Sequence, residues 1–217
     1  MYITTEATQQ TESTEAQVLT RVRRAGRGIV WCAERLALGL PRNAIDQALG
    51  RMTSKQQLTR IAHGIYLYPH MHPLRGTQPP LLADVLEMLA DIGAGPLVPT
   101  NETAAAMVGL AHQDHSTYTY GSVGVSRTIV TQWWTLTIRP IAPRGIVGVH
   151  ALTAVVIQAM RHIGHAQWND TCTAILRQHL LPASFALLAE QSGVAPAWMR
   201  PVLRGLAGPV SAAPNRQ

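Results

Sequence analysis

The 217-residue sequence predicts an α+β protein that is mostly helical and has two domains. Apolar residues recur at helical spacing in three segments before residue 53 and again in several segments after residue 80. Two other regions, 57–69 and 116–140, alternate or are rich in β-branched and aromatic residues, which is typical of strands. A proline-rich stretch without an apolar period, "HMHPLRGTQPP", separates the two sets of elements. We therefore expect two domains joined by a linker.

Composition argues against membrane, secreted and disulfide-rich proteins. No apolar run reaches the roughly 18 residues of a membrane span. The N-terminus lacks a charged region followed by an apolar one, as a secretion signal would have. The two cysteines, Cys32 and Cys172, are far apart and form no disulfide framework. We expect a cytoplasmic protein without membrane contacts.

The net charge of +6 is concentrated in the N-terminal domain. Residues 21–60 contain nine basic and two acidic residues, whereas the chain from residue 76 onward contains eight basic and seven acidic residues. A basic domain joined to a nearly neutral one indicates a polyanionic partner for the first domain only. A solubilising surface would also account for the excess charge.

Three helices are expected at the start of the chain, after a Thr- and Gln-rich flexible tail at 1–14. Ser13 or Thr14 can cap the first helix, which ends near Gly26. The second is short, at about 32–38, and the third spans about 41–52. In the third helix, apolar residues fall on one face at i, i+3, i+4 and i+7, namely Ile45, Ala48, Leu49 and Met52.

A β-hairpin is predicted directly after the third helix. The segments "QLTRIA" and "IYLYP" are separated by His63-Gly64, where glycine supplies the positive φ of a tight turn, and Pro69 ends the second strand. Three helices followed by a hairpin outline a winged helix-turn-helix at residues 15–72. In that fold the polar front of the third helix enters the major groove of double-stranded DNA, and the hairpin reaches the adjacent backbone or minor groove.

The polar face of the third helix and the hairpin carry suitable groups for binding DNA. Asn43 and Gln47 have paired donor and acceptor groups that suit adenine, and arginines suit guanine or phosphate. Gly50 would allow close approach of the backbone to DNA; alternatively it only weakens the helix. The predicted DNA-binding residues are Arg24, Arg27, Arg42, Asn43, Asp46, Gln47, Gly50, Arg51, Ser54, Lys55, Arg60, His63 and Gly64.

The linker is predicted at 73–80, a second domain at 81–208 and a flexible tail at 209–217. The second domain should contain two helices, three strands between 116 and 140, and four further helices from residue 150. Trp133 and Trp134 are expected on a strand, with one indole in the core. The other indole is either an exposed partner contact or partly covered by a helix.

No segment predicts catalysis, a cofactor or a metal. Histidines occur in three short-spaced pairs, but no cysteine pair or H-E-x-x-H helix completes a zinc site. "GSVGVSR" lacks the G-K-[ST] of a phosphate-binding loop and indicates a turn between strands. The acids Asp84, Glu87 and Asp91 lie at helical spacing and indicate a solvated helix face. We predict that the protein is not an enzyme.

Eight segments occur in an informative order: "RVRRAGRGIVW", "AIDQALGRM", "LTRIAHGIYLYP", "NETAAAMVGL", "SRTIV", "RPIAPR", "VIQAMRHIG" and "APAWMRPVLRGLA". Together, from about residue 14 to 207, they resemble the AbiEi-type antitoxin family of bacterial type IV toxin–antitoxin systems. The resemblance implies an N-terminal winged helix that represses its own operon from an upstream operator, and a C-terminal antitoxin domain. It also implies a nucleotidyltransferase-like toxin that is counteracted without a stable complex.

By position, the resemblance places the DNA-reading segment at 42–51 and the wing at 58–68. The sequence departs from the family in its longer N-terminal tail and in "SKQQ" between helix and wing. Two functions of different classes remain open: a repressor and antitoxin, or an interaction module whose basic domain binds RNA or an acidic protein. An enzyme with an unrecognised site in the second domain is the least supported alternative.

Overall fold

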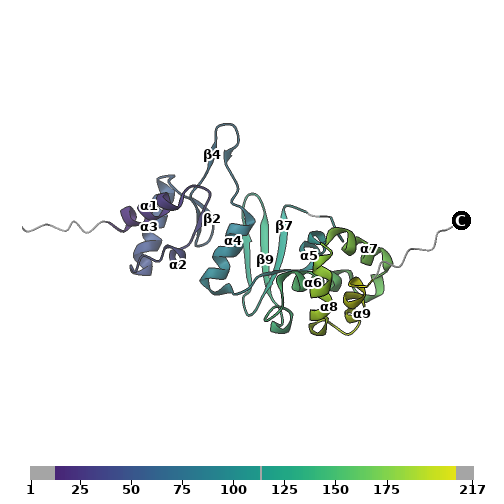
Figure 1. Cartoon of the computed structure of the whole chain (residues 1–217). Helices are drawn as coiled ribbons and strands as arrows, with labels where there is room; N and C mark the ends of the chain where they lie inside the picture. The colour runs from purple at the N-terminus through teal and green to yellow at the C-terminus, as the bar shows by residue number, and fades with distance from the viewer. Residues whose placement is uncertain (1–12, 113, 209–217) are drawn as a thin grey trace, which may run out of the picture. The chain divides into compact units, whose positions relative to one another are not determined.

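The computed structural model describes residues 13–112 and 114–208, and it confirms the α+β class: about half of the chain is helical and one of its sheets is mixed (Figure 1). The chain divides into two compact units, residues 1–92 and 93–217. The predicted tails lie outside the described residues, except that Ser13 caps the first helix and Thr14 begins it. No helix in the described part of the chain is long and apolar enough to cross a membrane.

Three helices form the core of the first unit. They are α1 (Thr14–Ala25), α2 (Ala33–Leu36) and α3 (Arg42–Ser54). The side chain of Ser13 accepts a hydrogen bond from the Ala16 amide and caps α1, as predicted. The predicted apolar face of α3 is buried: Ile45, Ala48, Leu49 and Met52 pack with apolar residues from α1 and α2. The helical period of the sequence thus identifies the inward face of α3 correctly.

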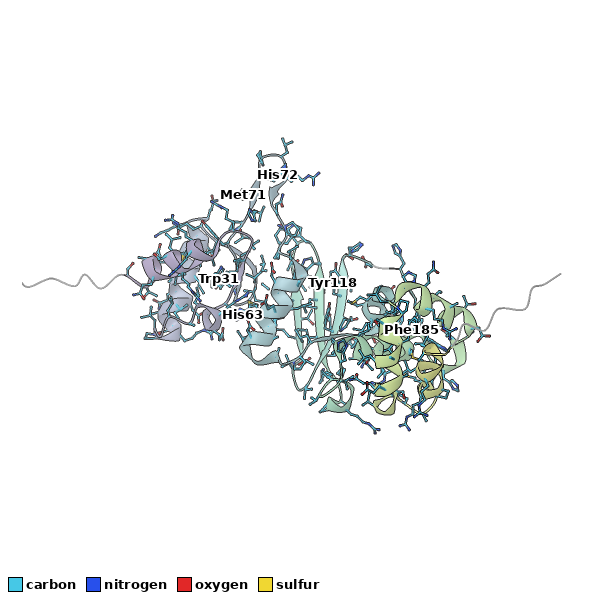
Figure 2. The ribbon with its side chains drawn as sticks, viewed as in Figure 1. Trp31, His63, Met71, His72, Tyr118 and Phe185 are labelled. Atoms are coloured by element: carbon cyan, nitrogen blue, oxygen red, sulfur yellow. The ribbon has the colours of Figure 1, made fainter. Side chains whose placement is uncertain are left out.

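A three-stranded antiparallel sheet in the order β1-β3-β2 completes this core. The strands are β1 (Val30–Trp31), β2 (Thr59–Ala62) and β3 (Ile65–Leu67). The predicted hairpin is confirmed, since β2 and β3 pair around His63-Gly64 and Gly64 has a φ of +70°. Strand β1 was not predicted, because two residues are too few to show an alternating pattern. It pairs with β3, and its Trp31 lies inside the unit (Figure 2).

The first unit extends further along the chain than the predicted first domain. Residues 70–80 were expected to lack regular structure, but they include a hairpin of β4 (Met71–His72) and β5 (Gly76–Thr77), which projects from the unit (Figure 2). Helix α4 (Leu82–Leu89), assigned by sequence to the second domain, packs against β1, and its Glu87 lies 4.0 Å from the Arg35 guanidinium. The division therefore falls after Ile92.

The second unit contains a mixed four-stranded sheet in the order β6-β7-β9-β8. Its strands are β6 (Val98–Pro99), β7 (Thr117–Ser122), β8 (Arg127–Val130) and β9 (Thr135–Pro140). The three strands predicted between 116 and 140 are present, whereas the two-residue strand β6 was not predicted. The prediction that Trp133 and Trp134 lie on a strand is wrong, because both precede β9 in a turn in which their amides donate to the Thr131 hydroxyl. Trp134 is buried and Trp133 partly buried.

Among the described residues of the second unit, five helices accompany this sheet: α5 (Asn101–Met107), α6 (Ala151–Ile163), α7 (Asp170–His179), α8 (Ala183–Glu190) and α9 (Met199–Leu206). Helix α6 is central, since it buries every residue from Thr153 to Met160 and packs along α5. Single helical turns occur at Ala90–Ala94, Pro143–Gly145, His165–Gln167 and Gln191–Val194. The helices predicted after residue 150 are therefore present.

The packing of α3 gives a testable expectation for stability. Replacing the fully buried Leu49 by Ala should lower the free energy of unfolding by about 2–5 kcal/mol, because it leaves a cavity between α3 and its neighbours. Gln47→Ala, two residues away on the exposed face, should change it by less than about 0.5 kcal/mol. Urea denaturation followed by circular dichroism measures both. Equal losses for the two variants would contradict the assigned inward face.

Candidate nucleic-acid interface

The outward face of α3 is polar and open to solvent. Its exposed residues are Arg42, Asn43, Asp46, Gln47, Gly50, Arg51 and Ser54. A Cβ built on Gly50 would meet no heavy atom within 4 Å, so a ligand can approach the backbone there. The Gln47 amide has no hydrogen-bond partner among the described residues and is free to bind a ligand. Asn43 keeps both of its amide donors, while its Oδ1 already accepts one hydrogen bond, from the Ala44 amide at 2.9 Å.

The cation at the N-terminal end of α3 is held between two acids. Arg42 Nε donates to Asp46 Oδ2 at 2.9 Å, one turn further along the helix, and another guanidinium nitrogen of Arg42 bonds Glu34 of α2. Glu34, and then Asp46, raise the pKa of Arg42 above its ordinary value. Arg42 and Asp46 were both predicted to contact DNA, but in the structure they contact each other.

The two cations at the other end of α3 share one carboxylate. Glu15, in the first turn of α1, accepts from Arg51 Nε at 3.2 Å and bonds the Lys55 ammonium. Hydrogen bonds from Lys55 and then Arg51 lower the pKa of Glu15 below its ordinary value of 4.5. Sequence reasoning missed this cluster, because Glu15 is separated from its partners by 36 and 40 residues.

The β2–β3 hairpin carries a paired arginine and histidine at its turn. An Arg60 guanidinium nitrogen lies 2.8 Å from His63 Nδ1, so the two predicted wing residues lie together and both are exposed. Gly64 beside them has open space around it. Arg27 is placed differently: it donates to the Pro69 carbonyl at 2.9 Å, at the opposite end of β3 from the turn. Arg24 is exposed on the last turn of α1.

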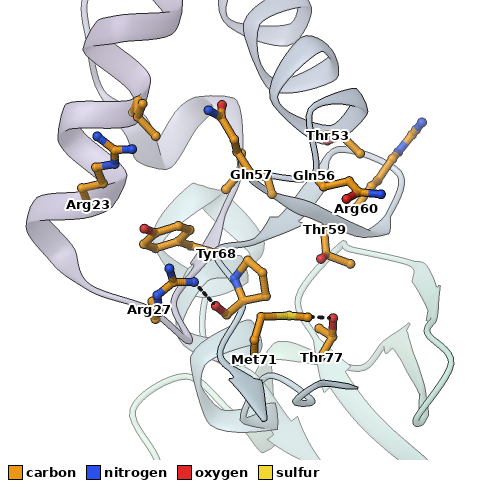
Figure 3. Close-up of a pocket in the computed structure, with 13 residues that line it drawn as sticks. Arg23, Arg27, Thr53, Gln56, Gln57, Thr59, Arg60, Tyr68, Met71 and Thr77 are labelled. Carbon is orange, nitrogen blue, oxygen red and sulfur yellow. Dashed lines mark hydrogen bonds between the residues drawn. The ribbon is translucent and has the colours of Figure 1, made fainter. Parts of the chain in front are cut away.

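A groove of about 790 Å³ lies in the first unit, between the end of α1, the segment that follows α3, and strand β2 (Figure 3). Residues at the end of β3 and on both strands of the β4–β5 hairpin complete it. Its thirteen lining residues include three arginines, Arg23, Arg27 and Arg60, and no acidic residue. Sequence reasoning missed the groove, because separate segments contribute its walls.

The described residues contain no group of three or more His, Cys, Asp or Glu side chains that could hold a metal ion. The exposed polar and charged groups described above lie mainly on α3, on the β2–β3 hairpin and in the groove.

These features define a two-unit α+β protein whose first unit exposes a polar helix with cations at both ends. The model of the family of unknown function DUF6088 matches residues 17–183, and the chain belongs to this family. No curated protein matches the sequence. Among solved structures, the RV2827C protein from Mycobacterium tuberculosis is similar over 82% of this chain and 75% of its own, with 13% identity and a TM-score of 0.41.

The Glu15 cluster makes a prediction about pH. Because the pKa of Glu15 is depressed in the folded chain, its ion pairs stabilise the fold above the unfolded pKa and are lost as the pH falls through the folded pKa. An NMR titration of the Glu15 carboxyl should give a midpoint below 4.5. Lys55→Gln should move this midpoint upward. Arg21→Gln, which removes a cation from α1, the helix that carries Glu15, should leave it unchanged. A midpoint at the ordinary value in the unaltered chain would contradict the cluster.

Proposed function

We propose that the chain is a DNA-binding transcriptional repressor whose first unit is a winged helix-turn-helix. The observation that carries this proposal is the element order α1, β1, α2, α3, β2, β3 with sheet order β1-β3-β2, combined with the exposed polar face of α3. In this fold the third helix reads the major groove, and the hairpin after it contacts the neighbouring backbone or minor groove. Helix α3 is the third helix of the chain and the β2–β3 hairpin follows it, and this order supports the proposal.

Base reading is assigned to the middle of α3. The free Gln47 amide has the donor and acceptor needed for a bidentate contact with adenine, and the Asn43 amide donors can reach an acceptor on a base edge. Gly50, one turn along from Gln47, leaves the helix backbone accessible. Each good base contact of this kind contributes about 1–3 kcal/mol of discrimination.

Affinity is assigned to the surrounding cations. Arg42, Arg51 and Lys55 are paired with acids, but all three cations are more than half exposed. Ion pairs open to solvent are worth only about 0–1 kcal/mol each, so phosphates can compete for these side chains. Arg60 and Arg24 supply further positive charge outside these clusters. Release of counterions from DNA then provides most of the binding free energy and makes it sensitive to salt.

We further propose that this repressor is the antitoxin of a type IV toxin–antitoxin system. The resemblance of the sequence to AbiEi-type antitoxins, which covers segments of both units, supports this role. The first unit would bind the operator of its own operon, and the second would counteract a nucleotidyltransferase-like toxin without forming a stable complex with it. Phosphodiester binding by the first unit needs no catalytic group.

Two substitutions separate base reading from phosphate binding. Gln47→Ala should cost about 1–3 kcal/mol on the operator and relax base preference at one position. Arg60→Ala should weaken binding to all duplexes similarly and reduce the salt slope of log K by about one. Fluorescence anisotropy on the upstream DNA of the chain's own gene and on a scrambled duplex, across a salt series, measures both effects.

The same measurement discriminates between the alternatives. If Gln47→Ala weakens both duplexes equally, α3 is not the reading element. If the unaltered chain binds a duplex RNA of the same sequence as tightly as the operator, the interaction-module alternative replaces the repressor. Melting temperatures of both variants serve as the control, and they should barely move because both side chains are exposed.

The antitoxin role is tested with a neighbouring nucleotidyltransferase-like gene. Expression of that gene alone should arrest growth, and co-expression of the full chain should restore it. Gln47→Ala should still restore growth when expressed from an unrelated promoter, because operator reading is separate from neutralisation. Failure of the full chain to restore growth would remove the antitoxin role while leaving DNA binding untouched.

A further inference from the structure

The groove of the first unit has a composition that suits an anionic ligand. Arg23 comes from α1, Arg27 from the loop after it, and Arg60 from β2 (Figure 3). The other polar lining groups are neutral amides and hydroxyls, which include those of Gln56, Thr53 and Thr59. No carboxylate among the thirteen lining residues neutralises the arginines or repels an anion. The surface of α3 differs, because its cations form ion pairs with carboxylates.

Two arginines of the groove can bind a ligand, one without a partner in the part of the chain that the structure describes and the other held in place by its neighbours. Arg23 is exposed and has no hydrogen-bond or ion-pair partner among the described residues. Arg27 is held in place, because its guanidinium lies 4.9 Å from the centre of the Tyr68 ring and one of its nitrogens donates to the Pro69 carbonyl. Only one of its donors is used in this hydrogen bond, so the others can reach a ligand that enters the groove. A held cation loses less freedom when it binds an anion.

The groove also has apolar lining groups. Leu19, Leu58, Pro69 and Met71 line it together with the Tyr68 ring. Small-molecule sites usually have volumes of about 300–1,000 Å³ and combine apolar walls with a few placed polar groups, and this groove of about 790 Å³ lies in that range. A site of this size with arginines beside apolar walls suits a ligand that joins a phosphate to a ring.

We propose that this groove binds a small phosphate-bearing molecule of about nucleotide size. Arg23 and Arg27 bind the phosphate oxygens, since a guanidinium fork matches phosphate geometry. The apolar walls contact the rest of the ligand, and the Gln56, Thr53 and Thr59 groups provide neutral hydrogen bonds. The site goes beyond DNA binding, because Arg23 and Arg27 line a groove and do not belong to the exposed face of α3 that is assigned to the major groove. Its occupation does not require that assignment to hold.

Isothermal titration of the full chain with AMP and with inorganic pyrophosphate tests this site. Near 0.15 M salt, where exposed charges are screened beyond about 8 Å, we expect saturable one-to-one binding of at least one probe. Arg23→Gln should weaken that binding about tenfold or more. Arg21→Gln is the matched control: it removes the same charge from the same helix, but Arg21 does not line the groove, so affinity should be unchanged.

Three outcomes would overturn the proposal. One is that neither AMP nor pyrophosphate binds at millimolar concentration. Another is an equal loss for Arg21→Gln and Arg23→Gln, which would indicate attraction to net charge alone. The last is binding of a single-stranded DNA oligomer that depends on Arg23 while neither small probe binds. Operator binding, measured in parallel, stays an independent readout, so failure of the groove proposal is distinguishable from failure of the repressor proposal.

Discussion

Burial of one face of α3 is the constraint on which the rest of the first unit depends. Ile45, Leu49 and Met52 are removed from water against α1 and α2. Because a helix turns by about 100° per residue, fixing these three side chains inward fixes Gln47 and Gly50 outward. The β2–β3 hairpin then follows within a few residues of the end of α3. The exposed polar surface is therefore a consequence of hydrophobic packing and needs no separate interaction to form.

The sequence predicts the features that depend only on residues close together in the chain. The face of α3 follows from apolar spacing, and the hairpin follows from His63-Gly64, where Gly64 takes the positive φ. Strands β1 and β6 have two residues each and exist only through pairing with distant strands, so no local pattern indicates them. Helix α4 was assigned to the wrong side of the division for a similar reason: its helical period is visible, but its packing against β1 is not.

The charged residues show even more clearly that local sequence does not predict contacts between distant segments. Counting charges finds nine basic residues between 21 and 60, but the first unit, 1–92, holds ten basic and eight acidic residues because α4 and the segment after it add three acids. The count also does not say which cations are free. Glu15 and Glu34 look minor in a window rich in arginine, yet they bind Arg51, Lys55 and Arg42. Arg23 looks like one more member of the same run, but it lines a groove that contains no acid. Two of the three paired cations have a partner only because α1 and α3 lie side by side, and the third bonds Glu34 because α2 lies beside the start of α3.

The pairing of these cations with acids has a consequence for specificity under the proposed function. A polyanion that approaches α3 must displace carboxylates from the cations there before it gains their charge, and this cost is the same for every sequence. The Gln47 amide has no such competitor, so a matching base edge gains its full contact. The acids paired with these cations, Glu15, Glu34 and Asp46, therefore lower the affinity for nonspecific DNA more than they lower the discrimination between bases. A repressor that searches among a large excess of nonspecific DNA benefits from the ratio of the two affinities rather than from affinity itself.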